Sequence, residues 1–177
     1  WTKQADESGN VRFYAYDIDY FDILPGQVVE MTDGTYAATH TVFNLSVTSI
    51  DEVNDTVSGT AEPTKKIEIY AWDDYGNTHW LYPMPDTSGN WTADFSGIVD
   101  IKPGTNGYAY QYDSQGSSTR VYWNIKNPHI EVYPLSDSID GYEWTPNTEI
   151  TLSITGADNF VKESNADGYV YFGPFDI

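Results

Sequence analysis

Short runs of alternating apolar and polar residues recur along this chain. The clearest runs cover residues 66–72, 119–125 and 149–154. A period of two residues places successive side chains on opposite faces of a β-strand. Turn signals such as Pro25-Gly26 and Asp167-Gly168 separate the runs. Many short strands with frequent turns predict an all-β sandwich or barrel.

The chain repeats itself with a period of about 80 residues. Residues 22–26, DILPG, recur at 100–104 as DIKPG. Residues 55–59, DTVSG, recur at 137–141 as DSIDG. A unit of this length is typical of a small immunoglobulin-like sandwich, so the sequence predicts tandem immunoglobulin-like β-sandwich units.

The register of the repeats divides the chain into one complete unit and two partial ones. Residues 52–127 hold a complete unit, residues 1–51 the back part of a preceding unit, and residues 128–177 the front part of a following unit. A partial unit would leave its apolar face and a strand edge uncovered. We therefore expect the tail of one copy to join the head of the next, or the missing halves to belong to a longer tandem protein.

Alternation within the complete unit predicts which side chains form its core. Five residues fall on one side of their strands and are expected to face inward. They are Trp91, Phe95, Tyr110, Val121 and Trp123.

The composition is acidic and aromatic, which narrows the range of functions. With 27 acidic and 8 basic residues the net charge is −19, and such a chain repels the phosphate backbone of nucleic acids. An aromatic content of 16% is too high for a disordered acidic tail. The chain has no cysteine, so it forms no disulfide. No apolar run reaches the length of about 18 residues that a membrane span requires.

Carboxylates gather where two of the predicted units meet. Asp51, Glu52 and Asp55 lie at this junction. Calcium prefers carboxylate and carbonyl oxygens as ligands. A calcium ion bound by these three residues would stiffen the linker and is the one cofactor that the sequence suggests. The alternative is an ordinary polar linker.

Aromatic side chains gather around one predicted turn. Trp72, Tyr75, Trp80 and Tyr82 lie on or beside two adjacent predicted strands. Flat, exposed rings in such a cluster would bind carbohydrate by stacking, which makes polysaccharide a candidate partner. The alternative is that these rings fill the core.

The sequence contains none of the common catalytic motifs, such as a nucleophile elbow or a zinc-binding His-Glu-x-x-His. His40, His79 and His129 occupy different positions of the repeat, so we do not expect them to converge on one site. Paired carboxylates are common throughout so acidic a chain and do not indicate a glycosidase. We expect this protein not to be an enzyme.

Several strand and turn motifs follow one another in a characteristic order. They occupy residues 40–47, 55–63, 88–96, 103–105, 121–128 and 139–146. In this order they resemble the tandem immunoglobulin-like repeats of long secreted surface proteins of filamentous Chloroflexota (Anaerolineae type). The resemblance implies an extracellular or cell-surface location and carries over no catalytic residue.

These observations together favour an extracellular structural repeat that self-associates head to tail into a filament, sheath or surface layer. The alternative is a carbohydrate-binding or adhesive module of a larger secreted protein. Immunoglobulin-like sandwiches serve both roles, so the fold alone does not decide between them.

Overall fold

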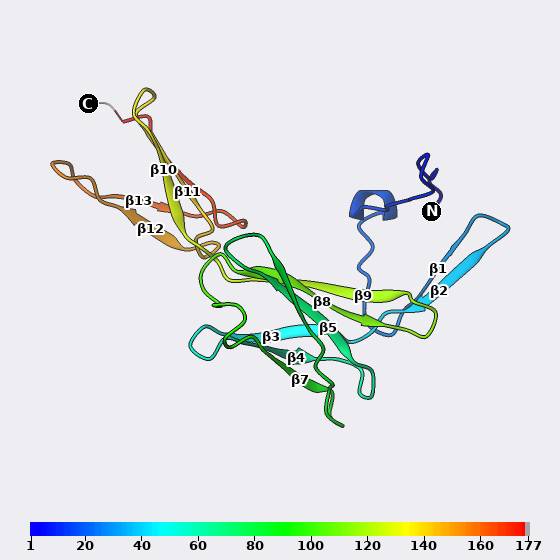
Figure 1. Ribbon diagram of the computed structural model, residues 1–177. Helices are drawn as coiled ribbons and strands as arrows, with labels where there is room; N and C mark the ends of the chain where they lie inside the picture. The colour runs from blue at the N-terminus through cyan, green and yellow to red at the C-terminus, as the bar shows by residue number, and fades with distance from the viewer. Residues whose placement is uncertain (176–177) are drawn as a thin grey trace.

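The computed structural model describes residues 1–175 and is built almost wholly from β-strands (Figure 1). One short 3-10 helix, η1 (Ala15–Ile18), precedes the strands β1 to β14. Each strand pair of the described residues is antiparallel. The predicted all-β fold class is confirmed.

The centre of the chain is a sandwich of two sheets. The first sheet has the order β3-β4-β7, formed by β3 (Ser46–Asp51), β4 (Thr56–Thr60) and β7 (Asn90–Asp94). The second has the order β6-β5-β8-β9, formed by β6 (Thr78–Leu81), β5 (Ile67–Trp72), β8 (Asn106–Tyr112) and β9 (Ser118–Asn124). This is an immunoglobulin-like arrangement in which the fourth strand, β6, joins the second sheet. The sandwich includes β3 as well as strands from the predicted unit at residues 52–127.

A continuous hydrophobic core fills the space between these two sheets. Trp91, Phe95 and Trp123 are buried in it as predicted, and Val121 packs against it partly buried. The prediction was wrong for Tyr110, which lies on the outer face of β8. Its neighbour Gln111 points inward instead, because its side chain binds the backbone of Glu62 and Lys65.

Residues 128–175 form a smaller, two-sheet unit that repeats the front of the sandwich. One sheet has the order β10-β11-β14, formed by β10 (His129–Tyr133), β11 (Ser138–Tyr142) and β14 (Val170–Phe172). The other pairs β12 (Glu149–Leu152) with β13 (Phe160–Glu163). These strands correspond in order and pairing to β3, β4 and β7, and to β5 and β6. Val170 lies opposite Gly141 as Trp91 lies opposite Gly59.

A hairpin near the N-terminus repeats the back of the sandwich. It consists of β1 (Val28–Thr32) and β2 (Ala37–Thr41). The backbone N–H of Gly26 donates to Val42, just as the N–H of Gly104 donates to Ile125. The hairpin therefore follows its Pro-Gly turn in the way that β8 and β9 follow theirs. Figure 1 shows it projecting from the end of the sandwich opposite the C-terminal unit.

One turn occurs in three copies at the spacing of the sequence repeat. Asp6, Asp86 and Asn165 each accept hydrogen bonds at Oδ1 from the backbone N–H groups two and four residues later. In the central copy Gly89 has φ of +87°, and a Cβ there would lie 2.6 Å from the carbonyl oxygen of Ala61. Glycine is therefore required at that position by both backbone conformation and space.

Replacing Trp91 by alanine should destabilise the central sandwich by about 3–5 kcal/mol, because the buried ring would leave a cavity between the sheets. Trp80→Ala is the matched control, since Trp80 is 41% exposed on the outer face and should cost only about 1 kcal/mol. Chemical denaturation of both variants measures the difference. Equal losses of stability would contradict this account of the core.

Candidate functional site

The outer face of the four-stranded sheet carries a dense group of aromatic rings, here called the aromatic face. Its members are Tyr70, Trp72, Trp80, Tyr108, Tyr110, Tyr112 and Tyr122. Four of them form a row across all four strands, because Trp80 pairs with Tyr70, Tyr70 with Tyr108, and Tyr108 with Tyr122. Ring centroids along this row are 4.6, 6.0 and 5.1 Å apart.

The central ring of the aromatic face is buried, whereas the rings on its two edge strands are exposed. Tyr70 is only 8% exposed, whereas Trp80 on one edge strand is 41% exposed and Tyr122 on the other is 51% exposed. Burial among its aromatic neighbours raises the pKa of Tyr70 to about 12. Neighbouring rings in the row are tilted by 56°, 50° and 58°, so they do not make one flat plane.

A charged row borders the aromatic row. Glu68 on β5 pairs with Tyr110 on β8, and Tyr110 pairs with Arg120 on β9. The Arg120 guanidinium lies 4.6 Å from the centroid of the Tyr108 ring, within cation–π range. Such a surface combines ring faces with hydrogen-bonding groups, which is the combination that a sugar or a polar aromatic partner would use.

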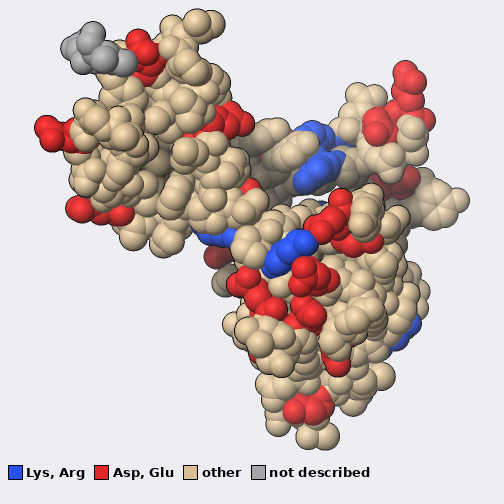
Figure 2. All heavy atoms as spheres, turned by 60° about the vertical axis from the view of Figure 1, so that its left-hand side comes forward, with Lys and Arg blue, Asp and Glu red and all other residues tan. Residues whose placement is uncertain are grey.

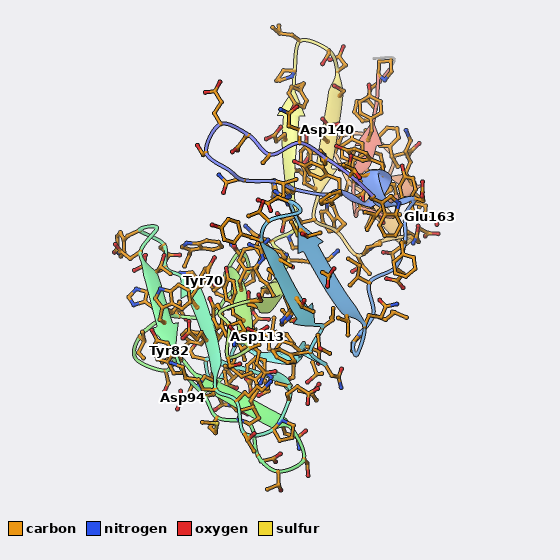
Figure 3. The ribbon with its side chains drawn as sticks, turned by 90° about the vertical axis from the view of Figure 1, so that its right-hand side faces the viewer. Tyr70, Tyr82, Asp94, Asp113, Asp140 and Glu163 are labelled. Carbon is orange, nitrogen blue, oxygen red and sulfur yellow. The ribbon has the colours of Figure 1, made fainter. Side chains whose placement is uncertain are left out.

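The structure brings together two of the four residues predicted to bind carbohydrate. Trp72 and Trp80 belong to the aromatic face. Tyr82 lies just beyond β6, with the Lys66 ammonium 4.8 Å from its ring centroid. Tyr75 stands apart in the β5–β6 turn and is 90% exposed. Figure 3 labels Tyr70 and Tyr82 within the central sandwich.

Sequence reasoning missed the tyrosines that form most of the aromatic face. Tyr108, Tyr110 and Tyr112 occupy every second position of β8, and Tyr122 lies beside them on β9. That alternation was a visible signal. Of these tyrosines the prediction placed only Tyr110 in the core, because alternation was expected to turn it inward with Val121 and Trp123.

The residues predicted to bind calcium lie where β3 leads into β4: Asp51 is the last residue of β3, and Glu52 and Asp55 lie in the turn that follows. Asp51 accepts hydrogen bonds from the backbone N–H groups of Val53 and Asn54 and from the Asn54 side chain, which lower its pKa. Asp55 accepts one from the backbone N–H of Ile101, 2.8 Å away. Across residues 1–175 no group of three or more His, Cys, Asp or Glu side chains is placed to hold a metal ion. Calcium binding at Asp51, Glu52 and Asp55 stays a prediction.

A polar contact fixes the base of the N-terminal hairpin to the sandwich. His40 Nδ1 lies 2.8 Å from Asp113 Oδ2, and His40 Nε2 lies 3.0 Å from Thr119 Oγ1. The Thr119 hydroxyl also accepts a hydrogen bond from the backbone N–H of Phe43. The interaction with His40 is the main cause that lowers the pKa of Asp113. This contact therefore sets the direction in which the hairpin leaves the central unit.

The other two histidines lie elsewhere. His79 Nε2 contacts Asp73 Oδ2 at the β5–β6 turn, and His129 Nδ1 contacts the carbonyl oxygen of Asn127. The structure does not bring the three histidines together.

An apolar groove of about 570 Å³ runs between the hairpin and β9. Its walls include Val29 and Met31 from the hairpin and Val121 from the sandwich. The apolar side of the hairpin is thus only loosely covered by its own chain.

Acidic side chains are scattered over the surface, with few basic ones between them (Figure 2). No helix among the described residues is long and apolar enough to cross a membrane.

Comparison with known proteins gives a limited result. No family model matches the chain, and no curated protein matches it. A tetra-tandem repeat in the extending region of a large adhesion protein is a similar solved structure, with a TM-score of 0.34 and 15% sequence identity. The match covers 82% of this chain and 46% of that one, so it spans less than half of the adhesion-protein structure. That structure is itself a tandem repeat, but so distant a likeness carries no functional argument, and an origin in filamentous Chloroflexota finds no support.

If calcium binds at Asp51, Glu52 and Asp55, adding calcium chloride should raise the thermal unfolding temperature more than sodium chloride of equal ionic strength. Sodium chloride would only screen the acidic surface. Glu52→Gln is a suitable control, because Glu52 is exposed and its replacement should remove the extra stabilisation without disturbing the turn. Equal shifts with both salts would exclude a specific site.

Proposed function

We propose that this chain is a structural repeat module of an extracellular or cell-surface protein, and that copies associate head to tail into a filament, sheath or surface layer. The observation that carries the proposal is the complementarity of its two ends. Residues 128–175 hold counterparts of β3 to β7, and the N-terminal hairpin is the counterpart of β8 and β9. Together the two ends contain the strands of one more complete sandwich.

Both ends expose apolar side chains that a complete unit would cover. Val29 and Met31 of the hairpin are 37% and 45% exposed, and Ile130 and Val132 of the C-terminal unit are 54% and 55% exposed. Burial of apolar surface contributes about 25 cal/mol per Å² and is the main driving force for protein association. Association of the two ends would therefore stabilise both.

The contact proposed is between different surfaces of each copy, so it does not close on itself as a two-fold dimer does. A head-to-tail contact propagates into a fibre unless the rotation closes a ring. Two further features are consistent with a structural role. Several carboxylates accept hydrogen bonds from turn backbones, and the three histidines lie at separate places.

The strong net charge of −19 opposes association between copies. Added salt screens this repulsion over about 10 Å at moderate ionic strength. Assembly through apolar contacts should therefore strengthen with salt, whereas assembly through charge complementarity should weaken.

Sedimentation velocity should show that the full chain forms larger species as its concentration and the salt concentration rise. A variant lacking residues 1–41 loses the hairpin and should stay monomeric. A variant lacking residues 1–23 keeps the hairpin and should still associate. Trp fluorescence of Trp91 and Trp123 checks that the central sandwich stays folded. A full chain that is monomeric under all these conditions would refute head-to-tail association.

The aromatic face supports a second candidate function, an adhesive module that binds polysaccharide. Its edge rings, Trp80 and Tyr122, are about half exposed and lie beside the polar groups of Glu68 and Arg120. Exposed aromatic rings pack well against the apolar faces of sugars, and the neighbouring polar groups can bind hydroxyls.

If the aromatic face binds carbohydrate, the protein should be retained by an insoluble polysaccharide such as cellulose or chitin. Trp80→Ala should abolish most of this retention, because it removes an exposed ring. Tyr75→Ala is the control, since Tyr75 is more exposed but lies off the aromatic face. Retention that both variants share equally, or none by the original chain, would remove this candidate.

A further inference from the structure

We propose that β1 of one copy pairs antiparallel with β12 of a second copy, in the register that β8 adopts on β5. The product is a four-stranded sheet of order β13-β12-β1-β2, which completes the C-terminal sandwich. This inference rests on the proposed head-to-tail association and adds the strand edge and the register.

The first step of the argument is the free edge of β12. In the central sandwich β5 pairs with β6 on one side and with β8 on the other. Among residues 1–175 its counterpart β12 pairs with β13 alone. An unpaired edge of this kind presents backbone donors and acceptors to an added strand, which is an established recognition mode.

The second step is a comparison of equivalent side chains in the complete and incomplete units. Val132 pairs with the buried Ile139, so it lies on the core side of β10, yet it is 55% exposed. Its counterpart on β3 is Ile50, which pairs with the buried Val57 and is itself partly buried. In the central unit β3 contacts β9, the strand that residues 128–175 do not supply. The exposure of Val132 thus marks the place that a hairpin equivalent to β8 and β9 would cover.

The third step is the distribution of apolar and polar side chains over the two faces of the hairpin. Met31 pairs with Ala38 and Val29 with His40, so these four side chains share one face. Val29 and Met31 are 37% and 45% exposed on that face, where they line the loosely filled groove. The opposite face carries Glu30 and the threonines, with Val28 exposed at its end. The hairpin therefore has an apolar side suited to a core and a polar side suited to solvent.

The register follows from the two sets of strand pairs. Ile69 lies opposite Ala109, and Ala71 opposite Gly107, on β5 and β8. On β12, Ile150 and Leu152 take the places of Ile67 and Ile69. Leu152 pairs with Phe160, five residues before the turn residue Asn165, as Ile69 pairs with Leu81, five residues before Asp86. Counting from the shared Pro-Gly turn, Met31 and Val29 take the places of Ala109 and Gly107. Met31 should therefore lie opposite Leu152, Val29 opposite Ile154, and the outward-facing Glu30 opposite Ser153.

A second copy is the occupant that the structure favours. The hairpin and the C-terminal unit of one chain lie at opposite ends of the central sandwich (Figure 1). The polar contacts of His40 with Asp113 and Thr119 hold the hairpin base at the far end. The hairpin of the same chain is therefore poorly placed to reach its own β12.

A disulfide between copies tests this register, because the chain has no cysteine of its own. The variant Glu30→Cys with Ser153→Cys places both thiols on exposed outward positions, where neither side chain supports a core. Paired residues on antiparallel strands lie about 4.5–5.5 Å apart at Cα, within the range for a disulfide. The control is Glu30→Cys with Thr151→Cys, whose positions are two residues out of register and about 7–8 Å apart.

Mild oxidation of the first variant should give a ladder of covalent oligomers on a non-reducing gel, an order of magnitude stronger than for the control. Sedimentation of the reduced proteins establishes separately whether copies associate at all. If the reduced proteins associate but the first variant gives no ladder, or the control gives the stronger ladder, the proposed register is wrong. Head-to-tail association itself would still hold. A crosslinked monomer would overturn the choice of a second copy, and no association in the reduced state would overturn the proposed function as well.

Discussion

Each sheet in this protein has one apolar face, and that face is stable only when a second sheet covers it. The central sandwich meets this requirement within the chain, because its three-stranded and four-stranded sheets enclose Trp91, Phe95 and Trp123. The C-terminal unit meets it only in part, since its second sheet is reduced to β12 and β13. The N-terminal hairpin has no covering sheet of its own. The proposed function and the proposed docking edge both follow from this one constraint.

Several of the acidic residues stabilise turns. Asp73, Asp86 and Asp113 each accept hydrogen bonds from nearby backbone N–H groups, and these and neighbouring side-chain partners lower their pKa values. Because the ionised form is favoured in the folded state, this stabilisation is present above the ordinary carboxyl pKa and is lost as the pH falls below it. Acidic residues that stabilise turns thus build up the net charge that opposes contact between copies.

Much of the fold could be predicted from the sequence because strand alternation and turn residues are local signals. The runs at residues 66–72, 119–125 and 149–154 overlap the strands β5, β9 and β12. The phase of β8 was misjudged, because the buried Gln111 is polar and gains its stability from hydrogen bonds to the distant residues Glu62 and Lys65. No local pattern reports such a long-range contact.

The candidate sites were harder to predict, because a site depends on which strands become neighbours. Trp72 and Trp80 were among the residues predicted for a site, but Tyr108 and Tyr122 join them only through the pairing of β5 with β8 and of β8 with β9. Asp51 and Asp55 were expected between two units and lie instead at a turn of one sandwich. Their carboxylates are already used by backbone donors, which a list of acidic residues does not reveal.

Hydrogen–deuterium exchange of the full chain at rising protein concentration tests most directly whether an incomplete unit is completed by another copy. At low concentration the amides of β5 and β8 should be strongly protected, and those of β1 and β12 should exchange quickly. As concentration rises, protection should increase in β1 and β12 together, while β5 and β8 stay unchanged. A C-terminal unit that is as well protected as the central sandwich at the lowest concentration would contradict the account.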